Sequence, residues 1–78
     1  MPDQHSDSGK IAAFLNENPR EFFCDHCIAQ ATGVPVDQVD PTVRPLAHTA
    51  EFERKFGQIC SRCGRRHICT KSLGPVVG

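Results

Sequence analysis

The sequence predicts an α+β fold in which three short helices are followed by a two-stranded β-hairpin. Apolar residues recur with a helical period up to residue 47, and the pattern then changes to an imperfect alternation. Two C-x2-C couples, Cys24/Cys27 and Cys60/Cys63, are separated by 32 residues. Because a chain of 78 residues with 38% apolar content has a marginal core, we expect the four thiols to act as a staple.

The start of the chain argues against secretion and against membrane insertion. Residues 1–7 are polar, and no apolar stretch of signal-peptide type follows them. Five cysteines, an odd number, also fit a reducing compartment better than a set of disulfides. We therefore expect a cytoplasmic protein with no membrane partner, whose paired cysteines serve metal binding or redox chemistry.

Charge is divided unevenly along a chain whose formal net charge is zero. Residues 1–43 carry two basic and seven acidic side chains, whereas residues 44–78 carry seven basic and two acidic ones. The basic half permits an anionic partner. Its arginines could equally offset the charge of about −2 that four thiolates leave around a divalent metal ion.

The domain organisation is predicted to be simple. Residues 1–8 are polar and indicate a disordered tail, and residues 72–78 indicate a flexible one. Residues 9–71 then form one domain, which we expect to be monomeric.

A first helix is predicted over residues 9–18. Ser8 or Asp7 can cap its N-terminus, and Pro19 ends it. One apolar stripe follows the helical period: Ile11, Phe14 and Leu15.

The first cysteine couple is predicted to lie at a helix start. The β-prone pair Phe22–Phe23 leads into Cys24, and a short helix follows over residues 26–32 with Asp25 as N-cap and Gly33 at its C-terminal end. Free backbone N–H groups and the helix dipole favour thiolates at such a position.

Apolar residues continue with a helical period over residues 36–47: Val36, Val39, Val43, Leu46 and Ala47. Pro41 and Pro45 each remove a backbone donor. We expect a short piece over 36–40 and a second piece that begins with Asp40 as cap and Pro41 at its first position. A single kinked helix is the alternative.

The hairpin is predicted to have strands at 54–59 and 65–70, joined by a tight turn at residues 60–64. With a period of two, Phe52, Phe56 and Cys60 share one face. Ile68 is expected to point inward from the returning strand.

Zinc is the predicted cofactor, as one structural ion held by Cys24, Cys27, Cys60 and Cys63. Zinc binds thiolates tetrahedrally, and each C-x2-C turn places two sulfurs on one side of a loop. Iron held by four thiolates would give the same pattern. A redox dithiol is the other interpretation, although the βαβ context typical of thioredoxin-like motifs is missing.

The run Cys60–Gly64 resembles the zinc knuckle of zinc-ribbon and treble-clef domains. This resemblance implies a left-handed conformation at Gly64, after the second ligand. The helical couple resembles the other half of a treble-clef site, with the order of the two halves reversed along the chain.

Four further side chains are candidates for special roles. Cys69 fits a small core position, with a reactive thiol or a spare ligand as alternatives. His26 and His67 could replace a cysteine ligand but more simply face solvent. His48 follows a helix and can interact with its last carbonyls.

The order of elements resembles a winged helix-turn-helix domain, with a helix pair joined at Gly33–Pro35 and a hairpin as the wing. This resemblance implies that residues 36–47 would enter a DNA major groove and that the wing would touch phosphates. Asp37 and Asp40 on that helix oppose such binding. The basic residues predicted to contact nucleic acid are Arg44, Arg62, Arg65, Arg66 and Lys71.

The sequence favours an interaction module over an enzyme. It has no Ser/His/Asp set, no phosphate-binding glycine loop and no three-ligand zinc site that leaves room for a water. We therefore expect no small-molecule substrate. The predicted function is a zinc-binding module that contacts nucleic acid; the alternatives are a protein–protein adaptor that uses its acidic half or Phe22–Phe23, and a redox- or metal-responsive thiol protein.

Overall fold

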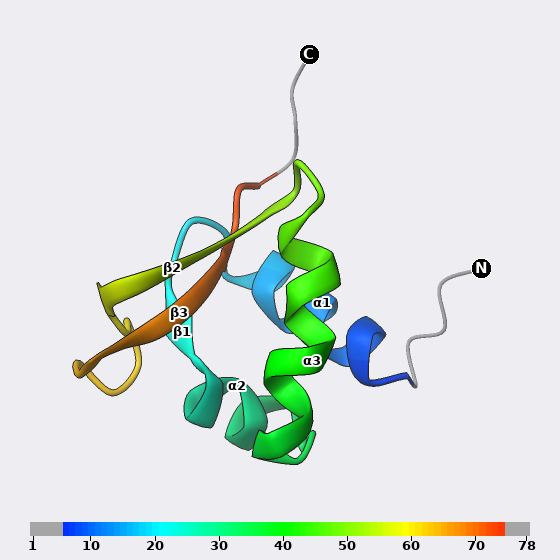
Figure 1. Cartoon of the computed structure of the whole chain (residues 1–78), viewed down its shortest axis with the longest axis horizontal. Coiled ribbons are helices and arrows are strands. Elements are labelled where there is room, and N and C mark those ends of the chain that lie inside the picture. Colours follow the sequence, from blue (N-terminus) through cyan, green and yellow to red (C-terminus); the bar gives the residue numbers. More distant parts are fainter. Residues whose placement is uncertain (1–5, 75–78) are drawn as a thin grey trace.

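A computed structural model describes residues 6–74, and the predicted tail residues 1–5 and 75–78 lie outside this range. The fold is α+β, with three helices packed against one side of an antiparallel sheet (Figure 1). The elements in chain order are α1 (Asp7–Glu17), β1 (Phe23–Cys24), α2 (Asp25–Thr32), α3 (Val36–Ala47), β2 (Phe52–Ile59) and β3 (Arg66–Ser72).

The sheet has three strands rather than the two predicted. Its order is β1-β3-β2, so β3 lies in the middle and pairs antiparallel with both neighbours. In β1, Phe23 faces Thr70 and Cys24 faces Cys69. A strand of two residues is too short to show an alternating pattern, and its partner lies far away in the sequence, so only the folded chain reveals it.

The first helix and the last strand of the chain both extend into residues predicted to be tails. α1 begins at Asp7, one residue after its N-cap Ser6, whose Oγ accepts a hydrogen bond from the Gly9 N–H at 3.1 Å. Ser6 therefore takes the capping role expected of Ser8 or Asp7. At the other end, β3 continues to Ser72, which is buried and donates its hydroxyl to Asn16 Oδ1 at 2.8 Å.

The cap of α2 also differs from the prediction. Cys24 is the N-cap, and Asp25, predicted to be the cap, is the first helical residue. The Asp25 carboxylate turns away from the helix to bind Arg54 on β2. The helix ends as predicted at Gly33, whose φ of 79° is left-handed.

α3 is one continuous helix, so the expected break before Pro41 is wrong. Val39 and Val43 are fully buried one turn apart, and this packing favours one continuous helix. Pro41 and Pro45 are both exposed, so the carbonyls that lose a helical donor can bond to solvent. Asp40, expected as a cap, binds Arg54 and Arg44 instead.

The core lies between the three helices and one face of the sheet. Phe14 on α1 packs against Phe23 on β1, with ring centroids 4.8 Å apart and the planes tilted by 54°. Leu46 and Ala47 of α3 are half-buried at the edge of this core, whereas Val36 is exposed. The buried apolar residues from these elements are Ile11, Leu15, Phe23, Ile28, Val39, Val43 and Phe52.

The outer half of the hairpin departs from the predicted alternation. Phe56 is 81% exposed rather than inward like Phe52. The register shifts between Lys55 and Gln58, where Gly57 has a left-handed φ of 68°, so an extra residue bulges out of β2. Phe56 lies beyond the helices, on a stretch of strand that projects from the core.

Candidate metal centre and the adjoining groove

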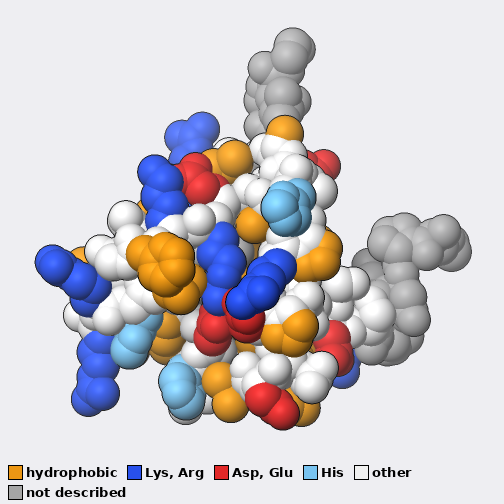
Figure 2. Space-filling model, viewed as in Figure 1, with side chains coloured by type: hydrophobic (Ala, Val, Ile, Leu, Met, Phe, Trp, Pro, Cys, Tyr) orange, Lys and Arg blue, Asp and Glu red, His pale blue; other side chains and the backbone are white. Residues whose placement is uncertain are grey.

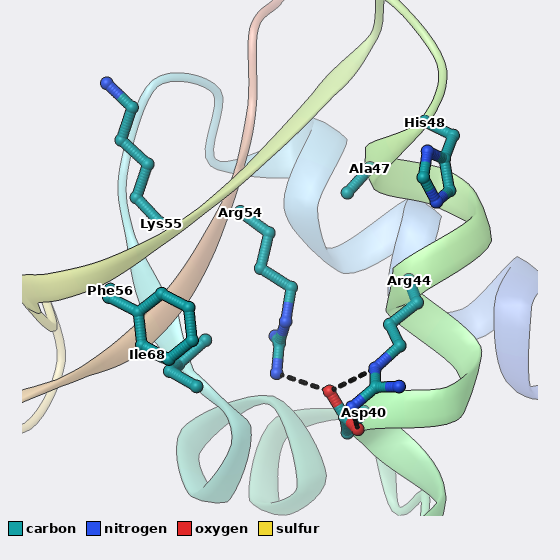
Figure 3. Close-up of a pocket in the computed structure, with 8 residues that line it drawn as sticks. All are labelled: Asp40, Arg44, Ala47, His48, Arg54, Lys55, Phe56 and Ile68. Atoms are coloured by element: carbon teal, nitrogen blue, oxygen red, sulfur yellow. Dashed lines mark hydrogen bonds and ion pairs between the residues drawn. The ribbon is translucent and has the colours of Figure 1, made fainter.

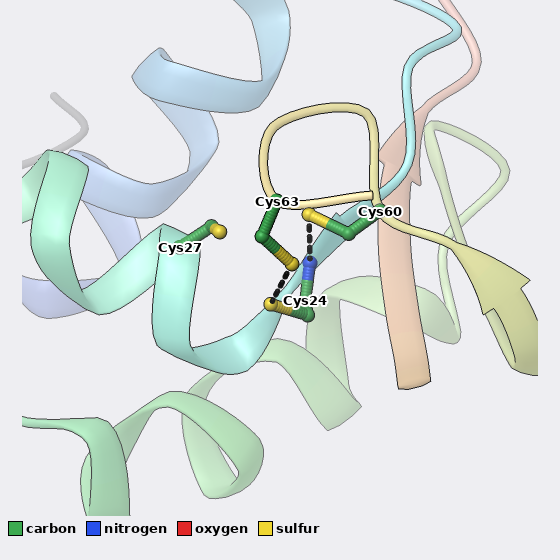
Figure 4. A group of neighbouring side chains, drawn as sticks. All are labelled: Cys24, Cys27, Cys60 and Cys63. Carbon is green, nitrogen blue, oxygen red and sulfur yellow. Dashed lines mark hydrogen bonds between the residues drawn. The ribbon is translucent and has the colours of Figure 1, made fainter. Parts of the chain in front are cut away.

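The four cysteines of the two couples come together at one end of the sheet (Figure 4). Cys24 ends β1, and Cys27 lies in the first turn of α2. Cys60 and Cys63 belong to the turn between β2 and β3. The local order predicted for both couples is therefore observed, and the fold joins a helix start to a hairpin turn.

The distances between the sulfurs fit a tetrahedral metal ion. All four Sγ atoms lie within 4.8 Å of one another, and those of Cys24 and Cys63 are 3.8 Å apart. Zinc–sulfur bonds of about 2.3 Å in a tetrahedron separate neighbouring sulfurs by about 3.8 Å. A disulfide would need about 2.05 Å, and all five cysteines are free thiols.

Backbone N–H groups surround the Cys60 sulfur. The N–H groups of Cys24 and Arg62 donate to it at 3.3 and 3.4 Å. Gly64, with a left-handed φ of 73°, closes the turn through its N–H to the Cys60 carbonyl at 2.9 Å. Burial alone would raise the pKa of the Cys60 thiol, but the N–H groups of Cys24, Cys63 and Arg62 outweigh it and lower the pKa to about 6.

Without a cation, the thiol pKa values of the helical couple, Cys24 and Cys27, shift in the opposite direction to that of Cys60. Burial raises the pKa values of the Cys24 and Cys27 thiols, and neighbouring cysteine side chains raise that of Cys27 further. Four sulfurs at this separation, three of them on buried cysteines, cannot all carry a negative charge unless a cation lies among them. The donor set therefore suits a thiophilic metal ion that makes each sulfur a thiolate.

Arg62 links the two couples. Its backbone N–H belongs to the knuckle turn, and its guanidinium Nη1 donates to the Cys27 carbonyl oxygen at 3.1 Å. The turn between β2 and β3 is also fixed to the residue before β1, because the Ser61 N–H donates to the Phe22 carbonyl at 2.7 Å. Arg62 thus has a structural contact where a phosphate contact was predicted.

The remaining ligand candidates lie outside the sulfur cluster. Cys69 is fully buried in the core, its Sγ approaches the Gln58 carbonyl at 3.6 Å, and burial raises its pKa to about 11. His26 and His67 are exposed beside the cluster, where they line a hollow of about 510 Å³. His48 caps α3 through its backbone N–H.

A buried ion-pair network lies next to the metal centre. Arg54 on β2 donates to both oxygens of Asp25, at 2.9 and 3.1 Å, and to Asp40 on α3 at 2.8 Å. It also donates to the hydroxyl of the buried Thr70 at 2.9 Å. Burial opposes its charge, yet the two carboxylates raise the pKa of the guanidinium. Asp25 directly follows the ligand candidate Cys24, so the network ties the metal centre to α3 and the sheet.

The basic residues predicted to contact nucleic acid do not form one patch. Arg44 forms an ion pair with Asp40 at 2.8 Å. Lys71 lies over the Phe22 ring, with Nζ 4.6 Å from the centroid, and is separated from Arg66 by most of β3. Arg65 and Arg66 are exposed and their side chains have no hydrogen bond or ion pair within residues 6–74.

A groove of about 370 Å³ separates α3 from the outer half of the hairpin (Figure 3). Phe56 and Ile68 form its wall on the strand side, and Ala47 and His48 lie on the helix side. Arg54 and Asp40 meet at its base. Three basic side chains and one acidic side chain line the groove: Arg44, Arg54, Lys55 and Asp40.

Sequence reasoning missed both Arg54 and Phe56. With a period of two, Arg54 falls on the same face as Phe52 and Phe56, but nothing near it in the sequence reveals its acidic partners, which come from two other elements. Phe56 carries the sequence signal of a core residue. The neighbouring Gly57 was the one available sign of a bulge, because an isolated glycine within a strand pattern often marks one.

Fold and site together define a small α+β protein with a four-cysteine cluster suited to a metal ion. Within residues 6–74, no helix has the length and apolar character needed to cross a membrane. Comparison of the chain with protein-family models, with curated proteins and with solved structures gives no match.

Proposed function

We propose that this protein is a structural-zinc module that binds nucleic acid through the end of its β2–β3 hairpin. Cys24, Cys27, Cys60 and Cys63 would hold the ion, and the four thiolates would leave no position for a catalytic water. Zinc would act by fixing the hairpin turn onto α2. The sulfur cluster supports the metal, and the free arginines beside it support the partner.

Zinc is favoured over iron by the general prevalence of zinc in small four-thiolate sites that fix a fold. Elemental analysis of the purified chain should give one zinc per molecule. The same preparation should be colourless, whereas an iron–thiolate centre would absorb visible light. One iron per chain would overturn the assignment of the metal.

The nucleic-acid proposal depends on one observation, the pair of unpartnered cations at the hairpin end. Arg65 and Arg66 are both exposed, directly after the knuckle turn. Figure 2 shows basic side chains projecting at this end of the molecule. Guanidinium groups with free donors bind phosphate oxygens well, and the zinc-fixed turn would hold their backbone in place.

Fluorescence anisotropy with labelled DNA and RNA, at low and at physiological salt, tests the proposal. We expect affinity to fall as salt rises, because each phosphate contact releases counterions. The double variant Arg65→Ala/Arg66→Ala should weaken binding and lower the salt dependence by about two phosphate contacts. Lys10→Ala, an exposed cation on α1, is the matched control. Absent or salt-independent binding would refute the proposal.

A further inference from the structure

We propose that the groove between α3 and the hairpin receives an unpaired base, stacked on Phe56, so that the protein prefers single-stranded to duplex nucleic acid. This inference rests on the proposed nucleic-acid function and adds the class of ligand. Three observations support it: the groove, the exposed Phe56 ring and the free arginines Arg65 and Arg66 at the hairpin end.

The exposed ring is the first part of this site. Phe56 is 81% exposed, whereas the other four Phe side chains within residues 6–74 are buried or half-buried. The bulge at Gly57 holds the ring outside the core, beside the half-buried Ile68 (Figure 3). A bulge beside a binding site commonly re-aims a side chain. Aromatic rings that face solvent offer bases a stacking surface that tolerates any sequence.

The groove next to that ring has the size and lining for a small planar group. Its volume of about 370 Å³ is within the usual range for a ligand site. Phe56 and Ile68 supply an apolar wall, while Arg44 stands on the opposite, helical side. Arg44 is 71% exposed, so its guanidinium can shift from Asp40 to a phosphate or a base edge.

The charges around the groove are balanced within the chain, because Arg44 pairs with Asp40, Arg54 with Asp25 and Asp40, and Lys55 with Glu53. Attraction for a polyanion therefore comes from the free arginines at the hairpin end, and His48 adds a donor at the groove itself. Arg66 lies two residues from Ile68 on β3, hence on the same face of the strand. A nucleic-acid strand with one base in the groove could therefore extend its phosphates toward the free arginines at the hairpin end.

Helix α3, which lines one side of the groove, is poorly suited to bind duplex DNA. Asp37 is exposed in the first turn of α3, where a recognition helix would meet base edges and phosphates. Pro41 and Pro45 occupy two further positions of its exposed face and offer no side-chain donor. Base-edge readout needs such donors, whereas stacking needs an accessible ring.

The test measures the affinity of the zinc-loaded full chain for three labelled probes of equal length. These are a single strand of mixed sequence, the corresponding duplex, and an abasic single strand that keeps the phosphates but lacks bases. We expect the mixed single strand to bind most tightly. Phe56→Ala should weaken that binding roughly 5- to 150-fold, the usual effect of losing one stacked base, and should leave the abasic strand unaffected.

Two variants serve as controls. Phe56→Tyr keeps a ring and should bind like the unaltered chain. Leu73→Ala removes an exposed apolar side chain beyond the end of β3 and should have no effect. Circular dichroism and zinc content should be unchanged in all three variants, because both positions are exposed.

The outcomes separate this inference from the proposed function. Equal binding of all three probes, reduced by Arg65→Ala/Arg66→Ala but not by Phe56→Ala, would refute base stacking and leave nucleic-acid binding intact. Failure to bind any probe would refute both. Phe56-dependent binding of a labelled acidic peptide in place of the strands would assign the groove to a protein and overturn the inference.

Discussion

Replacement of Arg54 by methionine should destabilise the fold more than any change at the other arginines near the groove. Methionine keeps much of the side-chain volume but removes the hydrogen bonds to Asp25, Asp40 and Thr70. The Arg54 side chain is only 12% exposed, so the two carboxylates would lose a largely buried counter-charge. Breaking a buried ion pair by removing one partner costs about 3–5 kcal/mol.

Access of solvent to the two carboxylates reduces this loss of stability. The Asp25 and Asp40 side chains are 25% and 38% exposed, and water can bind part of each carboxylate once Arg54 is gone. We therefore expect a loss of about 2–3 kcal/mol in the free energy of unfolding, since surface ion pairs contribute far less than buried ones. For a domain of this size, that loss lowers the melting temperature by about 10–20 °C.

Thermal unfolding followed by circular dichroism, with zinc at a fixed excess, measures the effect. Arg44→Ala is the control, because Arg44 pairs with the same Asp40 but is 71% exposed, and its loss should cost less than about 0.5 kcal/mol. Arg54→Lys should be intermediate, since a lysine cannot bridge both carboxylates with a planar fork. Equal stability of the Arg54→Met and Arg44→Ala variants would refute the reasoning.

Three further predictions concern the metal centre. Cys60→Ser should abolish stoichiometric metal and cooperative unfolding, whereas Cys69→Ser should retain one metal by elemental analysis; equal metal loss in both variants would contradict the assignment of ligands. Zinc affinity should fall as pH falls, because protons compete with the metal for the thiolates. Below about pH 6 the Cys60 thiol, with a pKa of about 6, must also lose a proton to bind metal. A competition titration should therefore show that the logarithm of the zinc affinity changes more steeply with pH there, by one additional proton released. No change in slope between pH 5 and 8 would count against the lowered pKa. Gly64→Ala should cost about 1–2 kcal/mol by urea denaturation, since its φ is 73° although a Cβ would meet no atom within 4 Å; a neutral effect would show that the knuckle turn adapts.

The four-cysteine cluster could be predicted from the sequence because the spacing within each couple already fixes where two sulfurs point. A C-x2-C turn is local, and Gly64 adopts the left-handed conformation that the knuckle pattern requires. The three helices were equally predictable, since Ile11, Leu15, Val39 and Val43 recur with the period of a helix that buries one face.

Prediction failed where a side chain's role depended on a distant partner. β1 exists because β3 offers it a free edge, and α3 stays continuous because its prolines face solvent while Val39 and Val43 are packed. Among the basic residues, Arg62 and Lys71 contact protein groups, and Arg65 and Arg66 remain free. Their sequence surroundings do not distinguish these cases.

The sequence by itself therefore determined the α+β class, the helical segments and the two cysteine couples that form the cluster, because these follow from short-range periodicity and turn chemistry. Only the tertiary structure decided that Arg54 is the buried centre of an ion-pair network and that Phe56 faces solvent at the edge of a groove. The physical reason is the same in both cases. Burial and charge pairing are set by which elements meet in space, and a bulge of one residue at Gly57 is enough to disrupt the pattern from which Phe56 had been predicted to face inward.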